Sequence, residues 1–412
     1  MSVDQVIEHV TCLGCGCACD DIAPIVRQNR IVEARNACPL GLAWFGDGKV
    51  PQEVRVGGRT ASLEAALAHA ATVLLQARRP LVYLAADLSC ETQRAAVGIA
   101  DRLRAVLDTA TSEIAAAVLA AQRRGRAAAT LGELRQHADL LVFWAVDPAE
   151  RYPRYTSRYA VAPGGRQSRT VVAVDVGDHR GPEDADARVG ISADAEVDAL
   201  GVMRAIARGN TPPDLPSLRP AIELVRRMMQ ARYVALVHDV EPDGTPADPP
   251  PDRAEGLIAL AQALNGPTRC ALSTLRAGGN RSGADAVVTW QTGFPYAVDF
   301  GRGYPAYRPH DGAAALVARR EIDATLVIGS PGSVPEPVAR GLASVPTVAI
   351  GPYASAAAFE PAVAVDTGVA GIHEGGMAFR MDDVPLPLRP SVAGPPAAAV
   401  VVRDLATRLA SP

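Results

Sequence analysis

The chain has 412 residues, of which 48% are hydrophobic and 21% charged, and its formal net charge is −4. This length allows two or three domains, and the weak negative charge argues against a nucleic-acid surface, which needs concentrated basic residues. Apolar runs are interrupted by charge before they reach the roughly 18 residues of a membrane-spanning helix, and the acidic start "MSVDQVIEHV" is unlike a signal peptide. We therefore expect a cytoplasmic protein without a membrane or nucleic-acid partner. Arginine is abundant and lysine nearly absent, which indicates a GC-rich genome rather than a function.

Residues 1–55 predict a small module that carries cysteines. The segments 5–11 and 30–36 have the composition of strands, and a polar turn around Asp20 and Asp21 lies between them. We expect a short hairpin with thiols in its loops.

From residue 56 the pattern changes to helices that alternate with buried strands. The segment 62–77 has helical spacing and opens with Ser62 and Glu64, which suit a first helical turn. Further helices are predicted at 90–106, 131–138 and 195–208, and strands at 80–87, 139–147 and 169–176. Strands separated by helices predict a parallel sheet with right-handed crossovers. The segment 56–210 is therefore expected to form a first α/β domain.

A Pro-rich stretch, 209–220, is followed by a second α/β pattern. Helices are predicted at 221–231, 253–266, 312–322 and 402–410, and strands at 233–239, 269–275, 323–330, 346–351 and 362–368. We expect 211–412 to form a second α/β domain with a C-terminal extension. The predicted fold class is α/β, with Rossmann-like parallel sheets, flanking helices and the small N-terminal cysteine module.

Most of the cysteines lie in the N-terminal module. Cys12, Cys15, Cys19 and Cys38 have the spacing C-x2-C-x3-C-x18-C, which lets neighbouring thiolates and a remote fourth converge on one group. Such a set suits an iron–sulfur cluster or a tetrahedral zinc ion, with Cys17 as a spare. Disulfides are not expected in the cytoplasm. A 4Fe–4S cluster, zinc and a reduced thiol cluster without metal all remain open on this pattern.

Four motifs, spread in order along the chain, resemble the B subunit of formylmethanofuran dehydrogenase. They are the cysteine pattern followed by "DDI" and "NAC", "FWAVDPAERYPRYTSRYAV" at 143–161, "VTWQTGFPYAVDFGRGYPAYRP" at 288–309, and "EGGMAFRMDDVPLPLRP" at 374–390. The resemblance implies kinship with molybdopterin-dependent formate dehydrogenases. In that family a tungsten or molybdenum bis-pyranopterin centre reduces CO2, and a 4Fe–4S cluster supplies the electrons. The metal is held by a cysteine or selenocysteine, and a neighbouring histidine assists.

Three departures from the family pattern concern that cofactor. The stretch 107–122, where the resemblance places the metal ligand, contains neither cysteine nor histidine, and Glu113 lies near the expected place. Tyr152 and Tyr155 stand where the family has paired histidines. The strand ending at Asp175 continues as "VGDHRG" instead of the family's usual sequence. The family's metal would need a soft thiolate or selenolate ligand there, so we expect the tungsto- or molybdopterin to be absent.

This pattern of loss is similar to the B subunit of the formyltransferase/hydrolase complex of aerobic methylotrophs. The resemblance implies that the partners are the A, C and D subunits of that complex, with a methanofuran-type carrier nearby. There a formyl group passes from formyl-tetrahydromethanopterin to the carrier and is hydrolysed to formate. Transfer belongs to the D subunit, whereas hydrolysis belongs to a zinc site in the A subunit. The role expected for this chain is non-redox and mainly structural. The alternative is an active tungsten or molybdenum formylmethanofuran dehydrogenase with unusual ligands.

The residues themselves offer little evidence for independent catalysis. No His-x-His or His-Glu-x-x-His pair and no Gly-x-Ser-x-Gly elbow occurs. We therefore predict no catalytic residue in this chain, which is expected to be part of an enzyme complex. Arg281 and Arg302 are the basic residues to examine if a cavity remains near 288–309.

Overall fold

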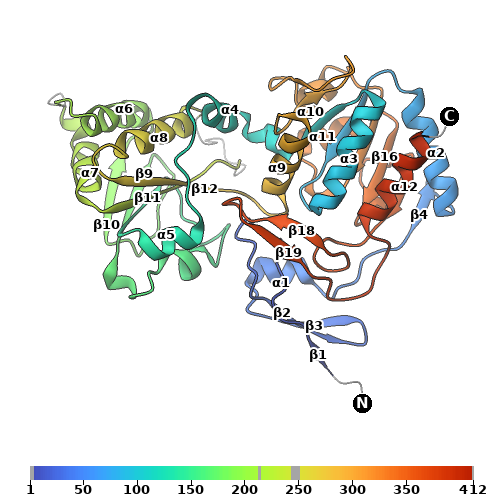
Figure 1. Ribbon diagram of the computed structural model, residues 1–412, viewed down its shortest axis with the longest axis horizontal. Coiled ribbons are helices and arrows are strands. Elements are labelled where there is room, and N and C mark those ends of the chain that lie inside the picture. The colour runs from blue at the N-terminus through green and yellow to red at the C-terminus, as the bar shows by residue number, and fades with distance from the viewer. Residues whose placement is uncertain (1–3, 212–214, 243–250, 411–412) are drawn as a thin grey trace. The chain divides into compact units, whose positions relative to one another are not determined.

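The computed structural model describes residues 4–211, 215–242 and 251–410. Parts of two sequence features, the start at 1–3 and the Pro-rich stretch at 212–214, lie outside the described residues. The chain divides into two compact units (Figure 1): unit 1 comprises 1–113 and 278–412, and unit 2 comprises 114–277.

Unit 1 begins with the cysteine module. Its strands β1 (Gln5–Val6), β2 (Ala23–Arg27) and β3 (Arg30–Arg35) form an antiparallel sheet in that order, followed by helix α1 (Pro39–Phe45). The hairpin between β2 and β3 turns at Gln28 and Asn29, whose φ angles are 49° and 56°. Asparagine tolerates such a conformation, and two consecutive positive φ angles match the twist of a tight hairpin.

The rest of unit 1 is an α/β layer structure with the sheet order β14-β13-β7-β6-β15-β16-β17-β4-β5. The strands from β7 to β17 in this order are parallel to their neighbours, and β13, β14, β4 and β5 are attached antiparallel at the two ends. The strand bounds are β4 (Val54–Val56), β5 (Arg59–Thr60), β6 (Pro80–Leu84), β7 (Val106–Thr109), β13 (Val298–Asp299), β14 (Ala306–Tyr307), β15 (Ala324–Ile328), β16 (Thr347–Gly351) and β17 (Val363–Asp366). The helix bounds are α2 (Leu63–Gln76), α3 (Cys90–Leu103), α9 (Arg281–Thr292), α10 (Ala313–Ala318), α11 (Glu336–Leu342) and α12 (Ala398–Ala410). A separate hairpin consists of β18 (Gly376–Phe379) and β19 (Pro385–Leu388).

Both faces of the unit 1 sheet are buried, because successive strand residues point to opposite cores. Val82 and Leu84 of β6 belong to one core, formed with α2, α3 and α12, whereas Leu81 and Tyr83 belong to the other, beneath α10 and α11 (Figure 1). This arrangement explains why the strands have nearly continuous apolar sequences. Helix α2 begins where the sequence predicts, since the Ser62 hydroxyl accepts a hydrogen bond from Ala65 N at 3.2 Å.

Unit 2 is built around a parallel sheet with the order β10-β9-β8-β11-β12. The strands are β8 (Leu140–Trp144), β9 (Thr170–Val176), β10 (Ala187–Ile191), β11 (Tyr233–Asp239) and β12 (Arg269–Leu275), and the helices are α4 (Ala115–Arg124), α5 (Leu131–His137), α6 (Glu196–Ala207), α7 (Arg219–Gln230) and α8 (Pro251–Leu264). Helices α6, α7 and α8 bury their apolar sides against one face of the sheet. A short helix at Thr156–Ala160 carries Tyr159, which makes an edge contact with Tyr155.

The predicted α/β class with parallel sheets, flanking helices and a cysteine module is confirmed. The strand partners, however, join segments that the sequence analysis assigned to different α/β domains: β6 pairs with β15, and β8 pairs with β11. The expected boundary after residue 210 also falls inside unit 2. Within the described ranges, no helix combines the length and the apolar composition needed to cross a membrane.

Candidate functional site

The structure brings the four predicted cysteine ligands into one part of unit 1. Cys12, Cys15 and Cys19 lie on the loop between β1 and β2, and Cys38 is the residue that precedes α1. The three loop cysteines are buried, and Cys38 is half-buried. Cys17 is also buried, with an exposed fraction of 0%. Burial therefore does not separate the predicted ligands from the spare cysteine.

Backbone hydrogen bonds define the shape of the cysteine loop. Cys12 N donates to Cys19 O at 2.9 Å, and Ala18 N donates to Cys15 O at 3.1 Å, so the loop closes on itself. Gly14 N donates to the Cys12 sulfur at 3.3 Å. An amide that donates to sulfur stabilises a thiolate, which is the form that binds metal.

The electrostatics of Cys12 identify which thiols surround it. Burial raises the pKa of Cys12 to about 12, the Gly14 N–H opposes this rise, and the nearby thiols of Cys15, Cys19 and Cys38 add to it. A Cβ placed on Gly41 would lie 3.4 Å from the Cys12 sulfur and 3.9 Å from the Cys38 sulfur. Gly41 therefore leaves room beside two thiols that are distant in the sequence.

This donor set fits an iron–sulfur cluster chemically. Such a cluster spreads four thiolate ligands over four irons, and Cys12 together with the three cysteines near it supplies that number of soft donors. In the part of the chain that the structure describes, no group of three or more His, Cys, Asp and Glu side chains is close enough to hold a single metal ion. Binding of a cluster or of zinc by these cysteines stays a prediction.

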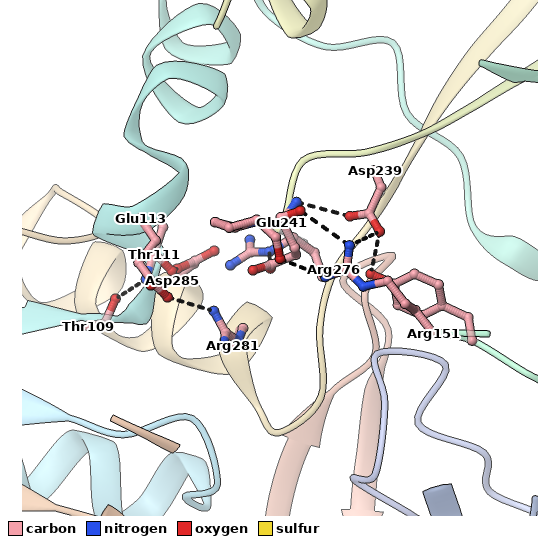
Figure 2. A network of polar contacts seen from close by, with 11 residues as sticks. Thr109, Thr111, Glu113, Arg151, Asp239, Glu241, Arg276, Arg281 and Asp285 are labelled. Carbon is pink, nitrogen blue, oxygen red and sulfur yellow. Dashed lines mark hydrogen bonds and ion pairs between the residues drawn. The ribbon is translucent and has the colours of Figure 1, made fainter. Parts of the chain in front are cut away.

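The second predicted region, 107–122, begins at the carboxyl end of β7. Arg281, at the start of α9, approaches Glu113 with 3.6 Å between Nη1 and Oε2; the Arg281 side chain is 15% exposed and the Glu113 side chain is 30% exposed. Thr111 donates its hydroxyl hydrogen to Asp285, and Thr111 N donates to Thr109 Oγ1 at 3.1 Å (Figure 2). A carboxylate and a guanidinium thus face each other where the resemblance places a soft metal ligand.

A buried carboxylate, Asp108, connects this region to the aromatic motif at 288–309. Its two oxygens accept hydrogen bonds from Ala297 N at 3.1 Å and Ala313 N at 2.5 Å. Burial raises the pKa of Asp108 to about 6, although these and other hydrogen bonds oppose the shift. Asp108 therefore fixes the loop that carries Tyr296 and Tyr307, whose rings make an edge contact at 5.5 Å.

We expect Asp108 to make the stability of unit 1 depend on pH. Its pKa is raised from 3.8 to about 6, so between these values the folded state keeps a proton that the unfolded chain has lost. Its contribution to stability is then full below about pH 4 and falls by up to about 3 kcal/mol as the pH rises through about 6. The destabilisation caused by Asp108→Asn should accordingly be larger at about pH 4 than at about pH 7, measured by hydrogen exchange of β7 peptides. An equal cost at both pH values would contradict the raised pKa.

Tyr152 and Tyr155 of unit 2, where the resemblance places paired histidines, are hydrogen-bonded to neighbouring side chains. The Tyr152 hydroxyl donates to Asp239 Oδ2 at 3.0 Å, and the Tyr155 hydroxyl lies 3.2 Å from Ser273 Oγ. Arg151 donates to the same Asp239 oxygen at 2.9 Å (Figure 2). Burial, followed by the Asp239 carboxylate, raises the pKa of Tyr152 well above its ordinary value. Tyr152 is therefore a neutral hydrogen-bond donor.

The network continues along the carboxyl end of β11. Asp239 Oδ1 accepts from Glu241 N at 3.0 Å, and Glu241 Oε1 accepts from Arg276 Nε at 2.8 Å. Burial raises the pKa of Asp239 to about 6, and the Arg151 charge opposes this rise. Sequence reasoning did not single out Arg151, Asp239, Glu241 or Arg276, and their only signal was a strand ending in Asp239.

The third departure, after β9, is also internally paired. Arg188 Nη1 contacts both oxygens of Asp175, at 2.6 and 2.8 Å, and Gly181 N donates to Oδ1 at 2.9 Å. Burial opposes ionisation of Asp175, but these donors hold its pKa below the ordinary value. In all three departures, polar or charged side chains contact one another within a single unit.

Known proteins similar to this chain cover nearly its whole length. No family model matches. The B subunit of the tungsten-containing formylmethanofuran dehydrogenase 2 of Methanocaldococcus jannaschii is 30% identical over 429 residues, which is 97% of each protein. The B subunit of the formyltransferase/hydrolase complex Fhc of Methylorubrum extorquens is 32% identical over 334 residues, or 78% of this chain and 86% of that protein.

A solved structure agrees with these relatives. A chain in the crystal structure of the formyltransferase/hydrolase complex (FhcABCD) from Methylorubrum extorquens in complex with methylofuran matches with a TM-score of 0.73 and 27% identity. The match covers 87% of this chain and 98% of that one. The resemblance predicted from the four sequence motifs is confirmed.

Proposed function

We propose that this chain, which belongs to the family of formylmethanofuran dehydrogenase B subunits, is the non-redox B subunit of a formyltransferase/hydrolase complex. In this role it assembles with the A, C and D subunits and helps to shape the path of a methanofuran-type carrier. The complex converts formyl-tetrahydromethanopterin to formate through that carrier. This chain contributes structure and assembly, and no catalytic site of its own.

The observation that carries this proposal is the chemistry of the expected metal-ligand region. The stretch 107–122 has no cysteine or histidine, and its Glu113 carboxylate faces Arg281 at 3.6 Å. The resemblance implies a cysteine or selenocysteine ligand for the tungsten or molybdenum here, and a carboxylate paired with a guanidinium supplies neither a thiolate nor a selenolate. The residues present therefore do not fit the metal centre.

The tyrosines support the same conclusion. A histidine can exchange a proton near neutral pH, whereas a phenol with a raised pKa stays protonated. Tyr152 directs its hydroxyl hydrogen to Asp239, which also accepts from Arg151. The family's histidine chemistry is therefore replaced by a structural hydrogen-bond network.

We further propose that the cysteine module keeps a 4Fe–4S cluster with a structural role. Cys12, Cys15, Cys19 and Cys38 would hold it, and Cys17 would not. When bound, such a cluster adds its binding free energy to the folding of the module. Hydrolysis of a formyl group transfers no electrons, so the cluster would serve no electron path.

The alternative function, an active tungsten or molybdenum formylmethanofuran dehydrogenase, has two specific observations in its favour. Two tungsten-containing relatives align over 97% and 95% of this chain, more than the 78% aligned with the Fhc relative. The four-cysteine set of an electron-transfer cluster is also retained. This alternative requires an oxygen ligand such as Glu113 to take the place of a thiolate.

Metal analysis of the purified complex distinguishes the two functions. We expect about four irons per copy of this chain, no tungsten or molybdenum, and a reducible cluster signal in electron paramagnetic resonance. Formate release from a formylated carrier should proceed without an electron acceptor. Tungsten or molybdenum near one per chain would reject the non-redox role. Absence of iron would instead reject the cluster and leave the proposed membership of the complex unchanged.

A further inference from the structure

Lys49 is the only lysine among the 41 lysine and arginine residues of the chain. A GC-rich genome explains the preference for arginine elsewhere but not this exception. Lysine and arginine differ chemically, because an ammonium is a compact charge with freely rotating donors on a flexible stem. The surroundings of this single ammonium are therefore informative.

Lys49 lines a cavity of about 280 Å3 within unit 1. The side chains around it are mostly polar, and they come from the β2–β3 turn, the segment after α1 and the region before α12; they include Gln28, Asn29, Arg30, Gln52 and His373. Several amide and cationic groups thus offer hydrogen-bond donors to one space. The volume is near the lower limit for small-molecule sites, which suits a small organic molecule.

The walls of this cavity are held in place by the fold. Asn29 Nδ2 donates to Ala393 O at 3.0 Å, and Ala393 N donates to Asn29 Oδ1 at 2.8 Å. A Cβ on Gly394 would come within 2.2 Å of the His373 ring, so only glycine allows this close approach. These contacts hold the β2–β3 turn and the ring of His373 against the segment at 393–394, on one side of the cavity.

His373 contributes no charge to the cavity. Its Nδ1 accepts a hydrogen bond from Val369 N at 3.1 Å, so its Nε2 carries the hydrogen donated to Gly48 O at 2.8 Å. Burial lowers the pKa of His373, in agreement with a neutral ring. The charge of the site is thus set by other residues.

The remaining charges leave the cavity net positive. Arg30 pairs with Asp47 at 2.7 Å, and the same carboxylate accepts the Lys49 backbone N–H at 3.0 Å. Within the described part of the chain, no carboxylate forms an ion pair with the Lys49 ammonium. The Asp47 carboxylate therefore lies near two cations, Arg30 and Lys49, and the Lys49 residue is exposed.

We propose that this cavity binds a small organic oxyanion, a carboxylate or a phosphate ester. The Lys49 ammonium forms the ion pair, and the amides of the turn supply neutral hydrogen bonds. This inference goes beyond the proposed function and does not depend on it, because it uses neither the thiols of the cysteine module nor any residue of the pterin region.

The single lysine allows a chemical test in the intact complex. The complex is treated with a low concentration of an amine-acetylating reagent, and the peptide that contains Lys49 is quantified by mass spectrometry. Inorganic phosphate or citrate should slow acetylation of Lys49 severalfold in a saturable manner, compared with sodium chloride at equal ionic strength. The N-terminal amine of the chain is the internal control and should be unaffected. Protection by phosphate alone assigns a phosphoryl ligand, and protection by citrate alone assigns a carboxylate.

Binding to variants provides a second measurement. Calorimetric titration of the protecting anion should show about tenfold weaker binding to Lys49→Gln, since a charge-assisted hydrogen bond is lost. Lys49→Arg keeps the charge and should bind within about threefold of the original affinity. Arg403→Gln removes one charge from an exposed position of α12 outside the cavity and is the matched control. The proposal is overturned if neither anion protects Lys49, or if Lys49→Gln and Arg403→Gln bind alike.

Discussion

Replacement of Cys12 by alanine is expected to remove the iron of the chain and to unfold much of the N-terminal module. Cys12 is buried, accepts an N–H hydrogen bond from Gly14, and has the three other proposed ligands nearby. Metal binding of this kind can contribute on the order of 10 kcal/mol to the folding of a small module. We therefore expect iron to fall from about four per chain to near zero, measured by metal analysis, and hydrogen exchange of β2 and β3 peptides to accelerate strongly.

Cys17→Ala is the matched control for this experiment. Cys17 lies in the same loop and is also buried, but it lies outside the C-x2-C-x3-C-x18-C spacing of the proposed ligands. Its replacement should cost only the modest stability of a small apolar contact and leave the iron content unchanged. Loss of iron in Cys17→Ala but not in Cys12→Ala would show that the ligand assignment is wrong.

Replacement of Arg253 by methionine is expected to destabilise unit 2 by about 3–5 kcal/mol. Arg253 and Glu196 are 4% and 2% exposed, and their contacts are Nε–Oε1 at 2.6 Å and Nη2–Oε2 at 3.1 Å. Trp144 Nε1 also donates to Glu196 Oε1, at 2.7 Å. Loss of the guanidinium leaves a buried carboxylate whose remaining side-chain donor, among the described residues, is Trp144 Nε1. Hydrogen exchange of β8 and β11 peptides should accelerate by the corresponding factor.

Two further variants separate the buried pair from nonspecific effects. The double variant Arg253→Met with Glu196→Gln removes both charges and should recover much of the lost stability, because the cost comes from the unpaired carboxylate. Arg232→Met replaces an arginine of unit 2 whose side chain is 87% exposed, and it should change stability by less than about 0.5 kcal/mol. Equal costs for Arg253→Met and Arg232→Met would contradict the structural role of the pair.

Local sequence patterns predicted the elements of this fold well. The predicted strands at 139–147 and 233–239 correspond to β8 and β11, and Ser62 caps α2 as expected. These features depend on neighbouring residues: alternation or continuity of apolar side chains, and a hydroxyl at a helix start. The pairing of β6 with β15, which are far apart in the chain, was not predictable, since buried parallel strands present similar apolar faces to any partner.

In the candidate site, too, local sequence features were predictable and contacts between distant segments were not. The resemblance and the spacing of Cys12, Cys15, Cys19 and Cys38 were readable in the sequence, because thiols and motifs are recognisable wherever they fold. The partners of the changed positions were not readable: Arg281 reaches Glu113, and Asp239 receives Tyr152, only after distant segments have come together.

By itself, the sequence therefore determined the α/β class, the family and the lack of a soft ligand at 107–122. Only the tertiary structure decided which polar or charged partners the substituted residues contact and that the single lysine lines a cavity. The physical reason is that propensity and composition act over a few neighbouring residues, whereas hydrogen bonds, ion pairs and cavities require groups that are distant in the chain to meet in space.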